Sequence, residues 1–262
     1  MALLEIDDLT LTGSLPGRWL RRRAETRTLL DGLSLTVEKG GCTAIVCEEG
    51  GGKLPLTLAL FRLHPVRSGA IRLDGEDIVP MSERHFHRHV RRRMQGVFPE
   101  DFQALNPRMR LEPALRAALA LHEPKLQGKD RARRIEKAME LAGAPLSLRG
   151  RLPGEMSPAD RQRGALARAL LVQPRLLVGH DITRGLDASE QAEILNRLGD
   201  LRDSLGLSLL LMTHDLAVAA HMGDPIHILS RGKPVESGAP ESIVHDPQHD
   251  YTRMLVAAAG TR

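Results

Sequence analysis

A glycine-rich segment that directly follows a short apolar run contains residue types suited to binding phosphate. The run TAIVC at residues 43–47 is typical of a buried strand, and Gly50, Gly51, Gly52 and Lys53 lead from it into a stretch with helical spacing. Phosphate-binding loops have this order of strand, glycine loop and helix. Their backbone amides and helix N-terminus hold phosphates, and their lysine reaches the outer ones. We predict that the three glycines and Lys53 bind the phosphates of a nucleotide.

The same segment departs from the phosphate-loop pattern GxxxxGK[ST] at several positions. Cys47 stands where the first glycine is expected, and Leu54 stands where a serine or threonine hydroxyl would bind Mg²⁺. Pro55 has no backbone N–H to donate to a phosphate, and Glu49 adds an anion to a site for polyanions. Taken alone, the loop fits either a weak nucleotide site or a glycine-rich turn at the start of a core helix.

Four further segments follow in chain order, and together they make a specific pattern. They are RRRMQGVFPEDFQALNPRM at 91–109, PGEMSPADRQRGALARALLVQPRLLV at 153–178, GHDITRGLD at 179–187 and MTHDLAVAA at 212–220. Their order and spacing resemble the ATPase subunit of an ABC transporter. The LNPRM sequence and the ending HDPQHDYTRMLVAA are similar to the oligopeptide, dipeptide and nickel importers in particular. The resemblance covers nearly the whole chain.

The resemblance implies a fold and a domain organisation. The expected fold is α/β, with a P-loop NTPase-like (RecA-like) core, a mostly parallel sheet, an N-terminal antiparallel β portion and an inserted helical subdomain. The apolar patterns predict strands at 3–6, 33–37, 175–179 and 207–213, a basic helix at 82–94, helices from about 110 to 150 and a hairpin in PIHILSRGKPVESG. Strands and helices alternate after residue 158, as parallel sheets require. We therefore expect residues 1–262 to form a single ABC-type nucleotide-binding domain, with the helical subdomain at approximately 98–156.

The resemblance also assigns roles to individual residues. Asp181 stands where the family's catalytic glutamate belongs, and His214 matches the histidine that contacts the γ-phosphate and supports the attacking water. Ser157 is the residue retained from the LSGGQ signature, which binds nucleotide held by the opposite subunit. Asp187 matches a loop at the subunit interface, and Trp19 lies where the family places an aromatic residue against adenine.

Other family positions carry replacements. Pro99 falls where the glutamine of the glutamine loop is expected, and His180 falls where a magnesium-associated aspartate is expected. The signature is replaced by a good helix start, with Ser157 at the N-cap, Pro158 at N1 and Asp160 at N3. His180 could bind a transition metal, but a single histidine at a strand end is more often structural, so we predict no metal site.

Composition limits the class of partner and the compartment. There are 37 basic and 33 acidic residues, and a net charge of +4 is too small to indicate a nucleic-acid partner. Arg21–Arg23 and Arg91–Arg93 are expected to be solvated faces. The two cysteines fit a reducing compartment, and there is neither a signal-peptide pattern nor a window of about 18 apolar residues. We expect a cytoplasmic protein, peripheral on the inner face of the cell membrane.

Two functions fit this pattern. The first is the ATP-binding subunit of an oligopeptide-, dipeptide- or nickel-type importer, with weak or no hydrolysis, which binds ATP and at most weakly Mg²⁺. Its partners would be membrane-spanning permease subunits, and it would form a homodimer or a heterodimer with a related ATPase subunit. The second is a non-hydrolysing scaffold or regulatory subunit that keeps the fold. Whether Lys53 and the glycines still hold nucleotide distinguishes the two.

Overall fold

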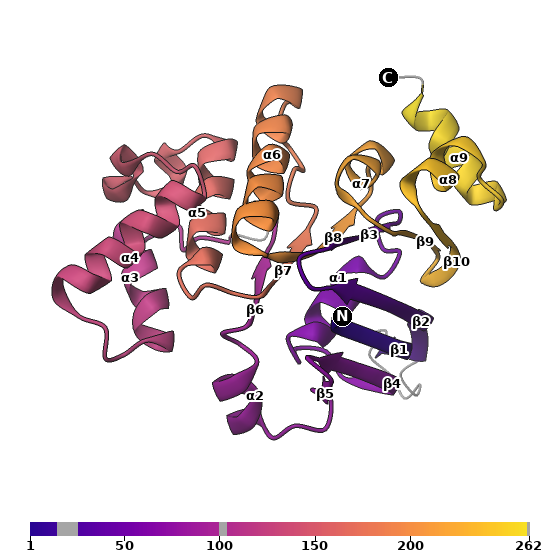
Figure 1. The fold of residues 1–262 in the computed structure, drawn as a ribbon, viewed down its shortest axis with the longest axis horizontal. Helices are drawn as coiled ribbons and strands as arrows, with labels where there is room; N and C mark the ends of the chain where they lie inside the picture. Colours follow the sequence, from indigo (N-terminus) through magenta and orange to yellow (C-terminus); the bar gives the residue numbers. More distant parts are fainter. Residues whose placement is uncertain (15–25, 100–103, 261–262) are drawn as a thin grey trace, which may run out of the picture. The chain divides into compact units, whose positions relative to one another are not determined.

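The computed structural model describes residues 1–14, 26–99 and 104–260, and the chain divides into two compact units (Figure 1). The first unit consists of Met1–Phe86 and Leu210–Arg262, and the second is His87–Leu209. The boundary falls inside helix α2 (Glu83–His89) and strand β8 (Ser208–Thr213). Within the described ranges, no helix is both long and apolar enough to cross a membrane.

The N-terminal part of the first unit is an antiparallel sheet with strand order β2-β1-β4-β5. Its strands are β1 (Ala2–Ser14), β2 (Thr26–Glu38), β4 (Val66–Leu73) and β5 (Glu76–Asp77). The sequence predicted shorter strands at 3–6 and 33–37. A bulge at Asp8, whose φ is 45°, shifts the alternation of β1 by one residue, so that Ile6 and Leu9 are both buried and the strand continues past residue 6.

A second sheet in the first unit has the order β10-β9-β3-β8. Strands β3 (Cys42–Val46) and β8 are buried along their whole length, as strands covered on both faces are. Strand β3 pairs in parallel with β9 (Ile226–Ser230), and β9 forms the predicted hairpin with β10 (Lys233–Gly238). The helices of this part are α1 (Lys53–Leu60), α7 (Leu216–Met222), α8 (Pro240–His245) and α9 (Asp250–Ala259).

The second unit contains a parallel strand pair and most of the longer helices. Strand β6 (Met94–Val97) pairs with β7 (Leu176–His180). The prediction of a helix through residue 94 was wrong, because α2 ends at His89 and the buried Met94 and Val97 begin and end a strand. The helices are α3 (Leu111–His122), α4 (Gly128–Leu141), α5 (Pro158–Leu170) and α6 (Ala188–Leu205), with short 3₁₀ turns η2 (Leu146–Gly150) and η3 (Pro153–Glu155).

Helices α3, α4 and α5 pack together in this unit (Figure 1). Buried leucines recur every fourth residue along α3, at Leu111, Leu115 and Leu119, which gives the helix one apolar stripe. Gly164 on α5 permits close packing, because a Cβ there would lie 3.2 Å from methyl carbons of both Leu105 and Leu111. The bounds of the inserted helical subdomain, 98–156, stay a prediction.

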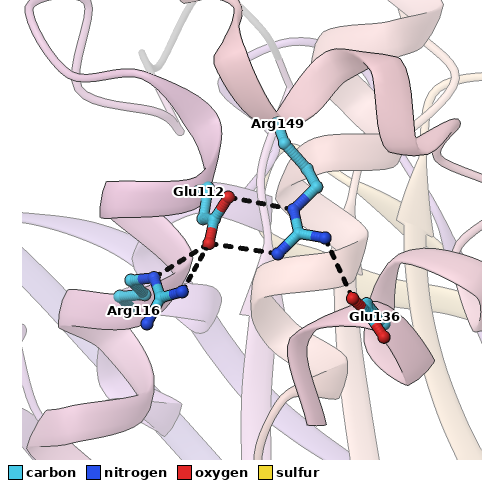
Figure 2. Close-up of polar contacts among 4 residues, drawn as sticks. All are labelled: Glu112, Arg116, Glu136 and Arg149. Carbon is cyan, nitrogen blue, oxygen red and sulfur yellow. Dashed lines mark hydrogen bonds and ion pairs between the residues drawn. The ribbon is translucent and has the colours of Figure 1, made fainter. Parts of the chain in front are cut away.

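A network of charged side chains joins three of these elements (Figure 2). The Arg149 guanidinium on η2 donates to Glu112 on α3 over 2.9 Å and to Glu136 on α4 over 3.0 Å. Arg116, one turn along α3, donates to the same Glu112 carboxylate over 2.9 Å. Hydrogen bonds from Arg149 and Arg116 lower the pKa of Glu112. The network therefore holds α3, η2 and α4 together most firmly when the carboxylates are ionised.

Candidate functional site

The predicted phosphate-binding loop has the backbone that its glycines allow. Gly50 and Gly52 have φ angles of 77° and 106°, in the left-handed region that favours glycine. Between them, a Cβ at Gly51 would lie 2.9 Å from the carbonyl oxygen of Glu48 and 3.0 Å from the Cβ of Cys47. All three glycines are thus required by the local geometry. The chain leaves β3, makes this tight loop and begins α1 at Lys53.

Lys53 lies under the loop that precedes it. Its side chain is buried, and Nζ donates a hydrogen bond of 3.2 Å to the carbonyl oxygen of Cys47, the first loop residue. Helix α1 has no acidic residue in its first turn, and its N-cap Gly52 has no side chain to accept from the first amides. An ammonium group and the positive end of a helix therefore occur together, which is the charge arrangement that binds phosphate.

His214 follows the strand that lies beside this loop. The carbonyl oxygen of Thr213, the last residue of β8, accepts a hydrogen bond of 3.1 Å from the amide of Cys47. His214 is exposed at the next position, and Asp215 then caps α7 by accepting from the Ala217 amide over 2.8 Å. The carboxyl ends of two neighbouring strands thus bring the glycine loop and His214 to one edge of the sheet, where ligands of open α/β sheets bind.

Glu48 connects the loop to two distant parts of the first unit. Its Oε1 accepts a hydrogen bond of 2.7 Å from the Arg231 amide in the β9–β10 turn, and its Oε2 accepts one of 2.6 Å from the Tyr251 hydroxyl on α9. Burial raises the pKa of Glu48, but these hydrogen bonds outweigh it and leave the pKa below its ordinary value. Burial and the contact with Glu48 raise the pKa of the Tyr251 phenol.

In the second unit, His180 and Asp181 lie at the carboxyl end of β7. Both side chains are buried, and His180 Nε2 lies 3.7 Å from Asp181 Oδ2. The His180 ring also stacks on Phe98, with ring centroids 6.3 Å apart. Asp181 has a φ of 41°, and its carbonyl oxygen accepts from the Arg184 amide in the following turn. No group of three or more metal-ligating side chains occurs among the described residues.

Ser157 and Asp187 each cap the helix that follows. Ser157 Oγ accepts a hydrogen bond of 3.1 Å from the Asp160 amide, and Asp160 pairs with Arg163 over 3.0 Å. The predicted N-cap at Ser157, with proline at the first helical position, is confirmed. Asp187 accepts from the Glu190 amide over 2.8 Å at the start of α6, and the Glu190 side chain completes a capping box.

Comparison with known proteins places this arrangement in a family. The sequence pattern of the ABC transporter family matches residues 30–183, which contain the glycine loop, the β7 end and the α5 start. The chain belongs to the ABC transporter family. The resemblance predicted from the order of motifs is therefore confirmed.

Similar curated ABC proteins are named for peptide import. A putative peptide import ATP-binding protein of Brucella abortus (strain 2308) is 40% identical over 227 residues, which are 87% of this chain and 68% of that protein. A probable peptide ABC transporter ATP-binding protein of Sinorhizobium fredii (strain NBRC 101917 / NGR234) is 35% identical over 263 residues, covering 98% of this chain and 72% of that protein.

Solved ABC cassettes share the fold. The dimeric structure of MJ0796, a bacterial ABC transporter cassette, has a TM-score of 0.79 and 20% sequence identity, covering 90% of this chain and 98% of that chain. The cassette cbiO1 from Clostridium perfringens has a TM-score of 0.78 and 21% identity, covering 94% and 91%. The predicted P-loop NTPase-like α/β fold, with an antiparallel β portion, is confirmed.

Within the ABC family pattern, the replaced positions have identifiable structural roles here. Leu54 is half-buried in the first turn of α1, with no oxygen in its side chain for Mg²⁺. Pro99 is buried after β6, and the carbonyl oxygen of its neighbour Phe98 accepts from the Gln162 amide group over 3.5 Å. His180 is a packing residue against Phe98. Pro99 and His180 are buried and Leu54 is half-buried, and none of the three side chains has the amide, carboxylate or hydroxyl expected at its position from the family resemblance.

The predicted site residues fall into three groups. The glycines, Lys53 and His214 come together in the first unit, whereas Asp181, Ser157 and Asp187 lie in the second. Trp19 lies outside the described residues. Sequence reasoning missed the contact between Glu48 and Tyr251, which are 203 positions apart. No spacing rule links residues so far apart in the chain.

Proposed function

We propose that this chain is the ATP-binding subunit of a peptide-type ABC importer, with weak or no ATP hydrolysis. The observation that carries the proposal is the glycine loop, in which buried Lys53 donates to the Cys47 carbonyl oxygen at the start of α1. Loop amides, an ammonium group and a helix N-terminus recognise the triphosphate of a nucleotide. The names of the relatives from Brucella and Sinorhizobium support peptide as the transported class.

Weak hydrolysis follows from the groups that the chain lacks at family positions. Leu54 supplies no hydroxyl to Mg²⁺, and His180 stands in place of an acidic side chain. Asp181 is one methylene shorter than a glutamate at the same position. General-base catalysis contributes roughly 10²- to 10⁴-fold, and a displacement of about 1 Å costs about 10²-fold of it. We therefore expect ATP binding that depends only weakly on Mg²⁺, with turnover far below that of an intact cassette.

The expected partners are membrane-spanning permease subunits and a second cassette, either identical or related. A mostly apolar cavity of about 210 Å³ in the second unit is lined by Leu105, Pro107, Pro153 and Arg161, among others. We propose this cavity as part of the surface that receives a permease loop. Through the permease, the chain would be held at the inner face of the cell membrane.

A second candidate function is that of a scaffold or regulatory subunit that binds no nucleotide. The observation that favours it is the start of α5, where Ser157 Oγ and the Asp160 carboxylate are engaged within their own helix. The carboxylate adds negative charge where the family signature meets a phosphate. In that case the chain keeps the fold and its docking surfaces but has lost both ATP binding and ATP hydrolysis.

Two measurements separate the candidates. Calorimetric titration of the purified chain with ATP, with and without Mg²⁺, measures binding, and a phosphate-release assay measures turnover. Micromolar binding with slow turnover supports the ATP-binding subunit, and no binding at millimolar ATP leaves the scaffold. Lys53→Met should abolish the binding, because it removes the only cation of the loop from the phosphates. Lys129→Met, an exposed lysine on α4, is the matched control and should bind as the wild type does.

A further inference from the structure

Helix α9 is fastened to the first unit at its start. The Glu236 carboxylate on β10 accepts hydrogen bonds of 2.7 and 3.0 Å from the amides of Gln248 and His249. His249 is the N-cap of α9, and its Nδ1 accepts from the Tyr251 amide over 3.1 Å. The first turn of α9 therefore has one fixed position relative to the β9–β10 hairpin, and so does the backbone of Tyr251.

The Tyr251 side chain extends from this turn toward the glycine loop. Its ring packs against the apolar cluster that contains Ala44 and Val46 of β3, the strand that leads into the loop. Its hydroxyl reaches Glu48 Oε2 over 2.6 Å. A half-buried aromatic ring with its hydroxyl on a carboxylate has one orientation, because both packing and a charge-assisted hydrogen bond define it.

The other oxygen of Glu48 is held by a second rigid part. The Arg231 amide that donates to Oε1 lies in the β9–β10 turn, where Arg231 and Gly232 both have positive φ. The carbonyl oxygen of Gly232 accepts from the Asp31 amide on β2 over 2.8 Å, which fixes the turn. Glu48 is thus held by one oxygen to a fixed turn and by the other to α9.

Because Glu48 is negatively charged, the position of its carboxylate affects how well the loop can bind a nucleotide triphosphate. Glu48 is two residues before Gly50 and directly follows Cys47, whose carbonyl oxygen receives Lys53 Nζ. Two like charges a few ångströms apart in a partly buried site repel by an energy large enough to affect binding. A carboxylate free to turn into the loop would therefore oppose a triphosphate and compete for the ammonium of Lys53.

We propose that Tyr251 is a positioning residue for nucleotide binding, which holds the Glu48 carboxylate against α9 and the β9–β10 turn and so keeps its charge out of the phosphate loop. The inference rests on the proposed function, since it presumes that the loop binds ATP. It makes α9, near the C-terminal end of the chain, a determinant of affinity for nucleotide, although the helix contributes no group to the loop itself.

The test compares ATP affinities of four variants of the full chain by calorimetry. Tyr251→Phe keeps the packing ring and frees Glu48 Oε2, so ATP should bind about tenfold more weakly while the thermal midpoint changes little. Adding Glu48→Gln to Tyr251→Phe should restore most of the affinity, because the freed side chain then carries no charge. Glu48→Gln alone should bind close to the wild type. Asp250 is the adjacent exposed carboxylate on α9, so Asp250→Asn is the control for loss of one negative charge, as in Glu48→Gln. It should bind ATP as the wild type does.

The outcomes separate the inference from the proposed function. If the wild type binds ATP and Tyr251→Phe binds equally well, the inference alone is overturned. It is also overturned if the double variant stays as weak as Tyr251→Phe, since Tyr251 then acts through structure and not through the charge of Glu48. A wild type that binds no ATP overturns both.

A spectroscopic measurement checks the contact without nucleotide. Tyr251 is the single tyrosine of the sequence, so incorporation of 3-fluorotyrosine gives one ¹⁹F resonance from this position. The contact with Glu48 requires the phenol to ionise at higher pH in the wild type than in Glu48→Gln. Equal titration curves in the two proteins would mean that the hydroxyl does not engage Glu48, and would overturn the inference.

Discussion

At the residue scale, the difference between a working phosphate loop and this one lies mainly in side chains and not in the backbone. Gly50, Gly51 and Gly52 adopt the conformations for which glycine is needed, and Lys53 is buried beneath them. Leu54, the next residue, is half-buried in the first turn of α1 and provides no metal ligand. On the proposed function, the backbone and Lys53 would hold phosphate, whereas the side chain at position 54 offers no oxygen to a magnesium ion.

Leu54→Ser should restore magnesium dependence to nucleotide binding. The new hydroxyl lies at the position from which a serine or threonine binds Mg²⁺ in the motif, so ATP should bind about tenfold more tightly with Mg²⁺ than without it. Calorimetry in Mg²⁺ and in a chelator measures the difference. Leu58→Ser, half-buried one turn further along the same helix, is the control for loss of a leucine. An equal gain in that variant, or no gain in Leu54→Ser, would contradict the assignment of the metal position.

The sequence identified these residues because the motif is local. A strand, three glycines and a lysine within eleven residues define a loop whatever surrounds it, as do Ser157, Pro158 and Asp160 at the start of α5. The Glu48–Tyr251 contact was not predictable in this way. It depends on where α9 packs, and that position is set by Glu236 and by a core cluster drawn from several elements.

At the scale of elements, α5 begins in a way that serves its own stability. Ser157→Ala removes the oxygen that accepts from the Asp160 amide, so the free energy of unfolding should fall by about 1 kcal/mol. Urea denaturation followed by circular dichroism measures this loss. Ser157→Asn retains a capping oxygen and should lose much less. Equal stability of the alanine and asparagine variants would show that the cap contributes nothing to the helix.

The charge network of α3, η2 and α4 predicts a pH-dependent stability (Figure 2). The folded pKa of Glu112 is lowered by Arg149 and Arg116, so its contribution is present above the unfolded carboxyl pKa and is lost as pH falls through the folded value. Arg149→Gln should therefore lower the urea midpoint at neutral pH, and the difference from wild type should shrink as the pH falls through the folded pKa of Glu112. Arg133→Gln, an exposed arginine on α4, is the control for charge. A difference that persists in acid would mean that Arg149 acts by packing alone.

The elements themselves could be predicted in part. The buried strands at β3, β7 and β8 and the helices after residue 110 have strong apolar patterns, and the sequence located them. Strand β6 was missed because four residues after a basic helix carry too short a pattern. The full lengths of β1 and β2 were missed because the bulge at Asp8 breaks the alternation on which a strand prediction depends.

At the scale of the whole molecule, the order of motifs along the chain predicted the family, although many individual positions depart from it. Each motif follows a strand or begins a helix of one fold, so their spacing carries information that substitutions within them do not remove. The antiparallel sheet of the first unit and the parallel strands of both units fulfil that expectation. On the proposed function, assembly of two cassettes would require the α5 start of one chain to meet nucleotide held by the other.

ATP alone should not dimerise this chain. In the family, the signature of one subunit binds the γ-phosphate held by the opposite subunit, whereas here Ser157 Oγ accepts from its own helix and Asp160 adds a like charge to the phosphate. Light scattering after size exclusion should give the mass of the 28.8 kDa chain with and without ATP. A variant with four substitutions tests this: Pro158→Gly, Ala159→Gly, Asp160→Gln and Leu54→Ser. It removes the charge of Asp160 and supplies a hydroxyl for Mg²⁺. ATP should then double the mass under conditions without hydrolysis. A wild-type dimer that requires ATP would instead mean that the self-capped helix still receives phosphate, and the barrier to turnover would then lie at Asp181 and His180.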